Sequence, residues 1–131
     1  YKDKYQKITE ILPEKARIFH WGGRYGAMGF LLSYSCPQRK IEVYEEDEER
    51  RNVLRNCYSL KRYSISILNK IPENWDAFDT FIFTAEESPD FENVPESIIW
   101  LVVCNQQSKE IPASAFEIVY EENGCRVAKR K

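Results

Sequence analysis

The residues of this chain best suited to hold a ligand form one glycine-rich segment from Ile18 to Gly29. Gly22, Gly23 and Gly26 lie in it between two apolar runs. Glycines at a strand-to-helix junction permit a tight turn and let the backbone approach a ligand closely, while the first helical turn offers unpaired N–H groups to an anion. The segment therefore predicts a ligand pocket at such a junction. Alternatively, the glycines serve only to let the helix pack on the sheet.

A second candidate is Glu45, which follows Gly26 by 19 residues. A carboxylate at the end of the second strand can accept hydrogen bonds from both hydroxyls of a ribose, and dinucleotide-binding proteins place one about 20 residues after their glycines. The cluster Glu45, Glu46 and Asp47 also suits the start of a helix, with Asp47 as its N-cap. The two roles are compatible, and both remain open at this point.

His20 is the only histidine, so no Ser-His-Asp, Cys-His or histidine-rich metal arrangement can form without it. We expect no metal site. The cysteines number four and are scattered without a Cys-x-x-Cys pair, which favours reduced thiols in the core. Trp21 precedes the glycines and either packs in the core or lines the mouth of the pocket.

The spacing of apolar residues predicts the elements that position these groups. A lead-in helix over residues 2–12 ends at a proline, and two strand–helix units follow it. The predicted strands of these units cover residues 17–21 and 40–44, and their helices cover 25–34 and 48–60.

Three further strands are predicted, over 63–67, 79–84 and 97–104, and a closing hairpin over 115–120 and 125–129 turns at Asn123-Gly124. The connections 68–78 and 85–96 are close to the shortest that a parallel crossover allows, so their helices must be short or degraded. The order specifies an α/β fold with a doubly wound, mostly parallel sheet of about seven strands and a C-terminal antiparallel hairpin. We expect one domain over residues 1–131, with a lead-in helix over 1–14 and a Rossmann-like core over 15–131.

Charge and hydropathy limit the partners. The 19 Lys and Arg residues nearly balance 21 Asp and Glu residues, which argues against a nucleic-acid partner. No apolar run approaches the ~20 residues that span a bilayer, so we expect no direct membrane insertion and a cytoplasmic location. The chain begins at Tyr1 without an initiator Met, which is compatible with a piece of a longer polypeptide whose other domains tether it to a membrane.

The chain resembles the class I S-adenosylmethionine-dependent methyltransferases over roughly its whole length. The family's first-strand glycine motif corresponds to Ile18 to Gly26, its second-strand acid to Glu45 with Asp47, and the Phe-Asp that opens its fourth strand to Phe78-Asp79. The terminal hairpin also corresponds. The resemblance implies a small-molecule nucleoside cofactor, S-adenosylmethionine, in a cleft beside the glycines.

The resemblance also has departures. His20 stands where the family has an acidic residue that helps to hold the methionine end of the cofactor, and Arg24 replaces the middle glycine. A cation at Arg24 suits a phosphate or carboxylate better than a sulfonium. The resemblance implies Asn69 as the contact to adenine. Glu86 follows the fourth strand and could serve as a base, but its position favours a solvated loop carboxylate, and no catalytic residue is assigned.

Three functions therefore remain. The first is a methyltransferase-type domain that binds S-adenosylmethionine or its demethylated product. The second is a non-catalytic methyltransferase-fold module appended to a larger enzyme, such as the C-terminal module of a bacterial glycerolipid acyltransferase polypeptide, which the lead-in resembles. The third is a nicotinamide dinucleotide binder, because Gly26-x-x-Gly29 follows Arg24 where that fingerprint has glycine.

Overall fold

The computed structural model of the chain describes residues 2–23, 26–57, 64–85, 90–104, 110–122 and 124–131, with the backbone alone for residues 2–4. Its elements alternate between helices and strands in the first half and are mostly strands in the second half. They are α1 (Lys2–Ile11), β1 (Arg17–Trp21), α2 (Ala27–Ser35), β2 (Lys40–Tyr44), α3 (Glu48–Cys57), β3 (Ile65–Leu68), β4 (Thr80–Phe83), the 3₁₀ helix η1 (Phe91–Asn93), β5 (Trp100–Val103), β6 (Phe116–Glu122) and β7 (Cys125–Arg130).

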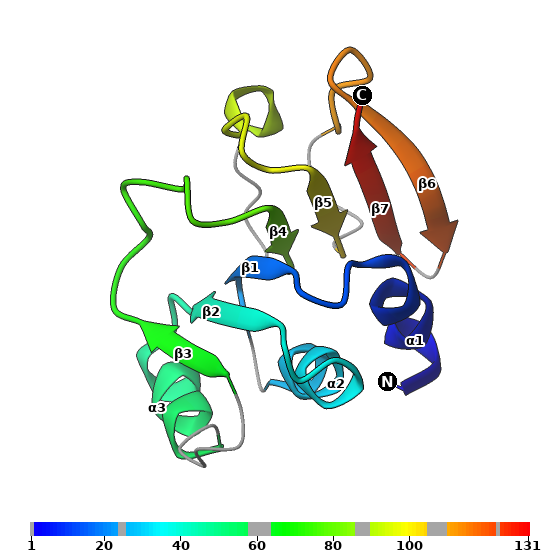
Figure 1. Cartoon of the computed structure of the whole chain (residues 1–131). Coiled ribbons are helices and arrows are strands. Elements are labelled where there is room, and N and C mark those ends of the chain that lie inside the picture. Colours follow the sequence, from blue (N-terminus) through cyan, green and yellow to red (C-terminus); the bar gives the residue numbers. More distant parts are fainter. Residues whose placement is uncertain (1, 24–25, 58–63, 86–89, 105–109, 123) are drawn as a thin grey trace.

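One seven-stranded sheet runs through the molecule in the order β3-β2-β1-β4-β5-β7-β6 (Figure 1). Strands β1 to β5 are parallel to one another, whereas β7 is antiparallel to both β5 and β6. The chain reverses its direction across the sheet between β3 and β4, so the crevice expected of a doubly wound sheet lies at the carboxyl ends of β1 and its neighbours. The predicted mostly parallel sheet with a C-terminal hairpin is confirmed.

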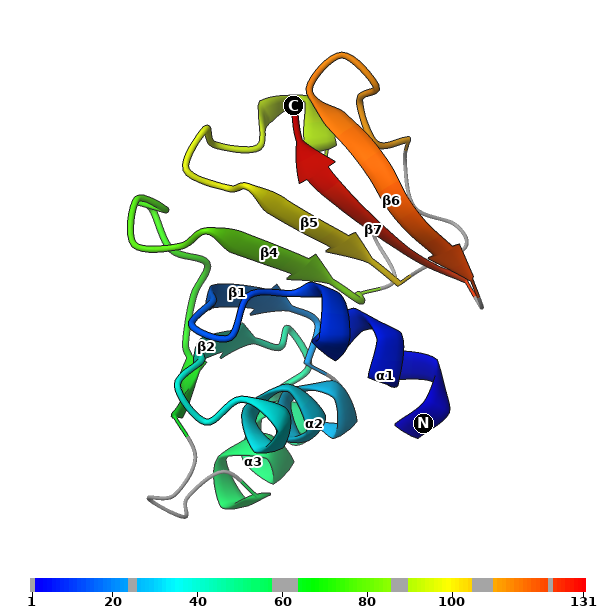
Figure 2. The same cartoon turned by 45° about the vertical axis from the view of Figure 1, so that its right-hand side comes forward.

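The three α-helices cover the same face of the sheet (Figures 1 and 2). Side chains from α1, α2 and α3 meet the alternate side chains of the strands in one apolar cluster, which contains Ile8, Leu32, Leu54, Ile18 and Val43. Successive strand residues point to opposite faces, so the apolar residues between them in the same strands point away from the helices and form a separate cluster on the opposite face of the sheet. Apolar burial on this first face fixes the helices that flank the glycine turn.

The opposite face, called the second face below, is covered mainly by connecting segments. Its core is aromatic and includes Phe19, Phe81, Phe83 and Phe91. Residues 69–79 cross this face without a helix, and among the described residues of 90–99 only η1 is helical. The two connections predicted to have short or degraded helices are thus the ones that cover this face.

Arg39 joins the lead-in helix to the core. Its side chain is fully buried, although no described carboxylate forms an ion pair with it. Its guanidinium instead donates to the carbonyl oxygens of Pro13 (2.9 Å), Leu12 (2.8 Å) and Leu32 (3.2 Å). It also donates to the carbonyl and the hydroxyl of Thr9. The cation thereby satisfies carbonyls at the ends of α1 and α2, where the helix dipoles favour positive charge.

Several boundaries differ from those predicted. Helix α2 begins at Ala27 because Gly26 adopts a left-handed conformation, with φ 90°, and acts as its N-cap. Strand β5 begins at Trp100 because Ile98 N bonds to Pro95 O in a turn before it.

Within the described residues, no helix has the length and apolar character needed to cross a membrane.

Candidate functional site

The glycine turn lies directly beside the end of β2. Strands β1 and β2 are parallel, with Trp21 opposite Tyr44. The hydrogen bonding continues one residue further, since Gly22 N donates to Tyr44 O at 2.7 Å. Gly22 has φ 91°, a left-handed conformation that glycine adopts at little cost, and it turns the chain out of the strand. Glu45 comes directly after Tyr44, the residue that is hydrogen-bonded to the turn, and therefore stands beside the turn.

The turn ends at the amino end of α2. Gly26 N bonds to Gly23 O at 3.0 Å, and Gly26 O accepts from Phe30 N at 3.0 Å in the first turn of the helix. Gly26 is the N-cap of α2 and has no side chain that could bond to the N–H groups of the first helical turn. That first turn also contains no acidic residue. These N–H groups and the helix dipole favour an anion.

Glu45 and Asp47 organise the start of α3. Glu45 is buried, and its Oε2 accepts from Asp47 N at 2.9 Å. The Asp47 carboxylate accepts from Arg50 N at 2.9 Å, which is the N-cap hydrogen bond expected from the sequence. Glu45 thus stands at the carboxyl end of β2 beside the glycine turn, whereas the carboxylate of Asp47 serves the helix.

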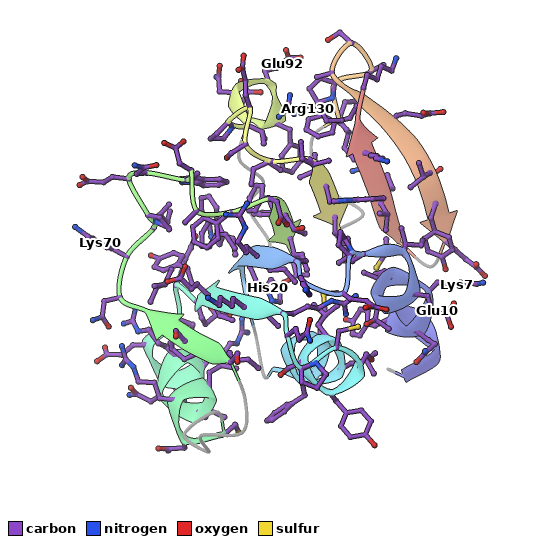
Figure 3. The ribbon with its side chains drawn as sticks, in the orientation of Figure 1. Lys7, Glu10, His20, Lys70, Glu92 and Arg130 are labelled. Atoms are coloured by element: carbon purple, nitrogen blue, oxygen red, sulfur yellow. The ribbon has the colours of Figure 1, made fainter. Side chains whose placement is uncertain are left out.

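His20 is buried between the sheet and the helices, in the interior of the molecule (Figure 3). Its Nε2 lies 2.9 Å from Oγ1 of Thr84, whose hydroxyl donates in turn to the carbonyl oxygen of Gly22. A hydroxyl has one hydrogen, so Nε2 must carry the proton that it donates to Thr84. The Nδ1 atom is then an acceptor, buried and without a hydrogen-bond partner among the described residues. Burial lowers the pKa of His20 from 6.5 to about 4, so the imidazole is neutral at pH 7.

Thr84 and Ala85, at the end of β4, close the turn from the other side. Thr84 N donates to Trp21 O at 2.9 Å, and a Cβ placed on Gly22 would lie only 2.5 Å from the nitrogen of Ala85. At Gly23 a Cβ would lie 2.3 Å from Cγ1 of Val43. Both glycines are therefore required by contacts within the protein. This supports the packing interpretation of these two residues alongside the ligand interpretation.

Trp21 packs on the second face. Its ring makes edge contacts with Tyr44 and Phe83, with centroid distances of 6.1 and 5.7 Å, and its Nε1 donates to Glu46 at 3.0 Å. The interpretation of Trp21 as packing material accounts for these contacts, and the tie to Glu46 holds the chain after β2 against the end of β1.

The other predicted site residues are distributed as follows. Asn69 follows β3, the edge strand, and its Oδ1 accepts from Arg55 of α3. Arg24 and Glu86 lie outside the described residues. Thus His20, Gly22, Gly23, Gly26 and Glu45 gather at the ends of β1 and β2, while Asn69 stands two strands away from the glycines. The sequence analysis did not predict that Thr84 bonds to His20 and Gly22. The only signal for it was its position as the last residue of a predicted strand.

The described residues contain neither a candidate metal site nor a disulfide. No group of three or more His, Cys, Asp or Glu side chains there could hold a metal ion. None of the four cysteines forms a disulfide in the described part of the structure, and Cys125 is the buried one.

No protein-family model and no curated protein sequence matches the chain. Solved structures do match it in fold. The fibrillarin/Nop5p complex superposes with a TM-score of 0.68 at 13% identity, over 92% of this chain and 75% of the other. A putative methylase from Haemophilus influenzae gives 0.61 at 14% identity, over 98% and 94%.

TrmK of M. capricolum, in complex with its natural cofactor product S-adenosyl-homocysteine, gives a TM-score of 0.62 at 8% identity, over 96% of this chain and 66% of TrmK. Putative methyltransferases from Escherichia coli and Streptococcus pneumoniae also match. The chain therefore has the class I methyltransferase fold. At these identities the likeness concerns the fold alone.

Proposed function

We propose that this chain is a methyltransferase-type domain that binds S-adenosylmethionine or S-adenosylhomocysteine at the glycine turn. The observation that carries the proposal is the hydrogen bond from Gly22 N to Tyr44 O. It holds together the strand-to-helix turn and the end of β2, where Glu45 stands. In doubly wound sheets, ligands bind at the carboxyl ends of the strands near the point where the strand order reverses.

The residues present fit most of such a ligand. The carboxylate of Glu45 suits the two hydroxyls of the ribose, and the N–H groups of the first turn of α2 suit the carboxylate of the methionine end. The proposal includes Arg24 near that carboxylate, Asp47 as the cap that holds the loop after Glu45, and Asn69 toward the adenine. When bound, S-adenosylmethionine supplies an activated methyl group, and the proposal names no catalytic residue.

One part of the ligand lacks a partner at the expected position. A neutral, buried His20 stands where the fold family has an acid for the methionine end, so it contributes no negative charge toward an ammonium group. We therefore expect affinity to depend on the ribose and the carboxylate, and to be weaker than a site with the acid would give.

Titration calorimetry tests the proposal. S-adenosylhomocysteine should bind the chain, and Glu45→Gln should weaken binding about tenfold or more, because a charged acceptor to the ribose hydroxyls is lost. Glu48→Gln, on an exposed residue of the first turn of α3, is the matched control and should bind like the parent. NADH is the competing ligand. Quenching of tryptophan fluorescence by NADH but not by S-adenosylhomocysteine would favour the nicotinamide alternative.

A non-catalytic module is the second candidate, and two observations favour it. His20 lacks the charge described above, and the second face has no α-helix among the described residues. Such a module would stabilise or assemble a longer polypeptide, for example a glycerolipid acyltransferase, whose His-Asp chemistry would lie outside this chain. Cooperative unfolding of the chain together with no binding of either nucleoside at millimolar concentration would support this candidate and exclude the enzymatic one.

A further inference from the structure

The second face carries a hollow that lies apart from the glycine turn. It has a volume of about 420 Å³ and is bounded by the middle of β2, the end of β3 and the segment that follows β3. Its lining residues are Glu42, Leu68, Asn69, Lys70, Pro72, Asn74, Ala77 and Phe78. This volume is within the range of sites for small ligands. Asn69 is the one lining residue that it shares with the predicted cofactor site.

The hollow exists because residues 69–79 pass over the sheet without a helix. Strand β2 has the alternating pattern of a strand with one open face, since Ile41 and Val43 are buried toward the helices while Glu42 points to the second face. Glu42 lies between Phe19 of β1 and Ser66 of β3 in the sheet register. A carboxylate thus occupies the floor of a hollow whose walls are partly apolar.

Glu42 is half-buried, yet its carboxylate makes no hydrogen bond or ion pair with any described residue. The cation in the lining is Lys70, whose ammonium lies 3.9 Å from a carboxylate oxygen of Glu73. The side chain of Lys70 points away from the body of the molecule (Figure 3). A carboxylate that is partly withdrawn from water and lacks a cation attracts one more strongly than an exposed carboxylate does.

The rim of the hollow supplies hydrogen-bond donors, whereas Glu42 on its floor is an acceptor. The Oδ1 atoms of Asn69 and Asn74 accept from Arg55 and from Asp76 N, respectively, so their amide nitrogens are the groups with hydrogens still to donate. Leu68, Pro72 and Phe78 supply the apolar surface between the rim and Glu42. The complementary ligand has a cation at one end, an aliphatic middle and an acceptor at the other end.

We propose that this hollow binds a small organic cation, an ammonium or guanidinium group on a short aliphatic stem, with the charge on Glu42. The same chemistry occurs in a free alkylamine and in a lysine or arginine side chain of a peptide. The site shares only Asn69 with the proposed nucleoside site, so binding at Glu42 can be tested separately from binding at Glu45.

The test is an NMR titration of the ¹⁵N-labelled chain with n-butylamine hydrochloride at constant pH and ionic strength, with n-butanol as the neutral counterpart. Amine binding should shift amide signals around Glu42, Leu68, Asn74 and Ala77 with millimolar affinity, and n-butanol should bind at least fivefold more weakly. Glu42→Gln should reduce amine affinity at least fivefold. Glu117→Gln, an exposed residue on the far strand β6, makes the same charge change and should have no effect.

Three results would overturn the proposal: equal binding of the amine and the alcohol, unchanged binding by Glu42→Gln in a variant with the parent melting temperature, or shifts located elsewhere. Displacement of the amine by S-adenosylhomocysteine would show that the hollow belongs to the nucleoside site. A second titration with acetyl-lysine-methylamide, whose α-amine is blocked, distinguishes the sources: tighter binding than n-butylamine assigns the hollow to a peptide side chain, and weaker binding assigns it to a free amine.

Discussion

The Nε2 atom of His20 lies 2.9 Å from the hydroxyl of Thr84, which donates to the carbonyl of Gly22 at the glycine turn. This chain of hydrogen bonds connects the ends of β1 and β4. It places a neutral ring near the end of β1, just before the glycine turn. The turn is therefore held by contacts inside the protein, and this ring brings no negative charge to the proposed site.

The first prediction concerns pH. Folding lowers the pKa of His20 from 6.5 to about 4, so between these values the unfolded chain binds more protons than the folded one. The contribution of His20 to stability is complete above pH 6.5 and is lost as the pH falls toward 4. The loss amounts to at most ~1.4 kcal/mol per pH unit. Urea unfolding at pH 7 and pH 5 measures it.

His20→Gln supplies the control for this prediction, because a glutamine can still donate to Thr84 but does not titrate. The free energy of unfolding of the parent should fall more between pH 7 and pH 5 than that of the variant, by about 1–2 kcal/mol. Equal falls in the two proteins would mean that His20 is not buried in its neutral form.

The second prediction concerns Gly23. Because its Cβ would lie 2.3 Å from Cγ1 of Val43, Gly23→Ala should lower the free energy of unfolding by about 1–3 kcal/mol through overpacking. Val43→Ala removes the methyl groups concerned. In a double-mutant cycle, Gly23→Ala should therefore cost less in the Val43→Ala background than in the parent, by about 1 kcal/mol or more. Additive effects of the two changes would contradict the close approach of Gly23 to β2.

The third prediction concerns Arg39. Arg39→Met keeps much of the side-chain volume but leaves the carbonyls of Thr9, Leu12 and Pro13 without their donor. We expect a loss of about 3–5 kcal/mol in the free energy of unfolding, because buried acceptors are left unpaired. Lys40→Met, at the exposed neighbouring position, should change it by less than about 0.5 kcal/mol. Similar losses in the two variants would show that Arg39 does not hold α1 to the core.

The sheet could be predicted from the sequence because apolar periodicity and glycine positions are local signals. Ile41 and Val43 alternate with polar residues, which is typical of a strand with one open face, whereas Phe81, Ile82 and Phe83 are consecutive apolar residues, which is typical of a central strand. The boundaries were less accurate: the strand predicted from Ser97 begins only at Trp100, because Ser97 lies within the turn that the bond from Ile98 N to Pro95 O closes. Local propensity does not record where the neighbouring strand ends its hydrogen bonding.

The candidate site was predictable only in part. Glu45 beside the glycine turn follows from parallel pairing of the first two strands, which the sequence order implies. The bonds of His20 to Thr84 and of Arg39 to Thr9 join residues 64 and 30 positions apart, and no local pattern indicates such partners. The hollow at Glu42 required knowledge that residues 69–79 cross the sheet without a helix.

Binding of S-adenosylhomocysteine at the glycine turn is tested most directly by an NMR titration of the ¹⁵N-labelled chain with this ligand. We expect the largest shifts on the amides of Gly22, Gly23 and Gly26 and of Glu45, and we expect Glu45→Gln to reduce them at equal ligand concentration. The absence of shifts at these amides at millimolar ligand, in a sample whose spectrum shows the folded chain, would contradict it.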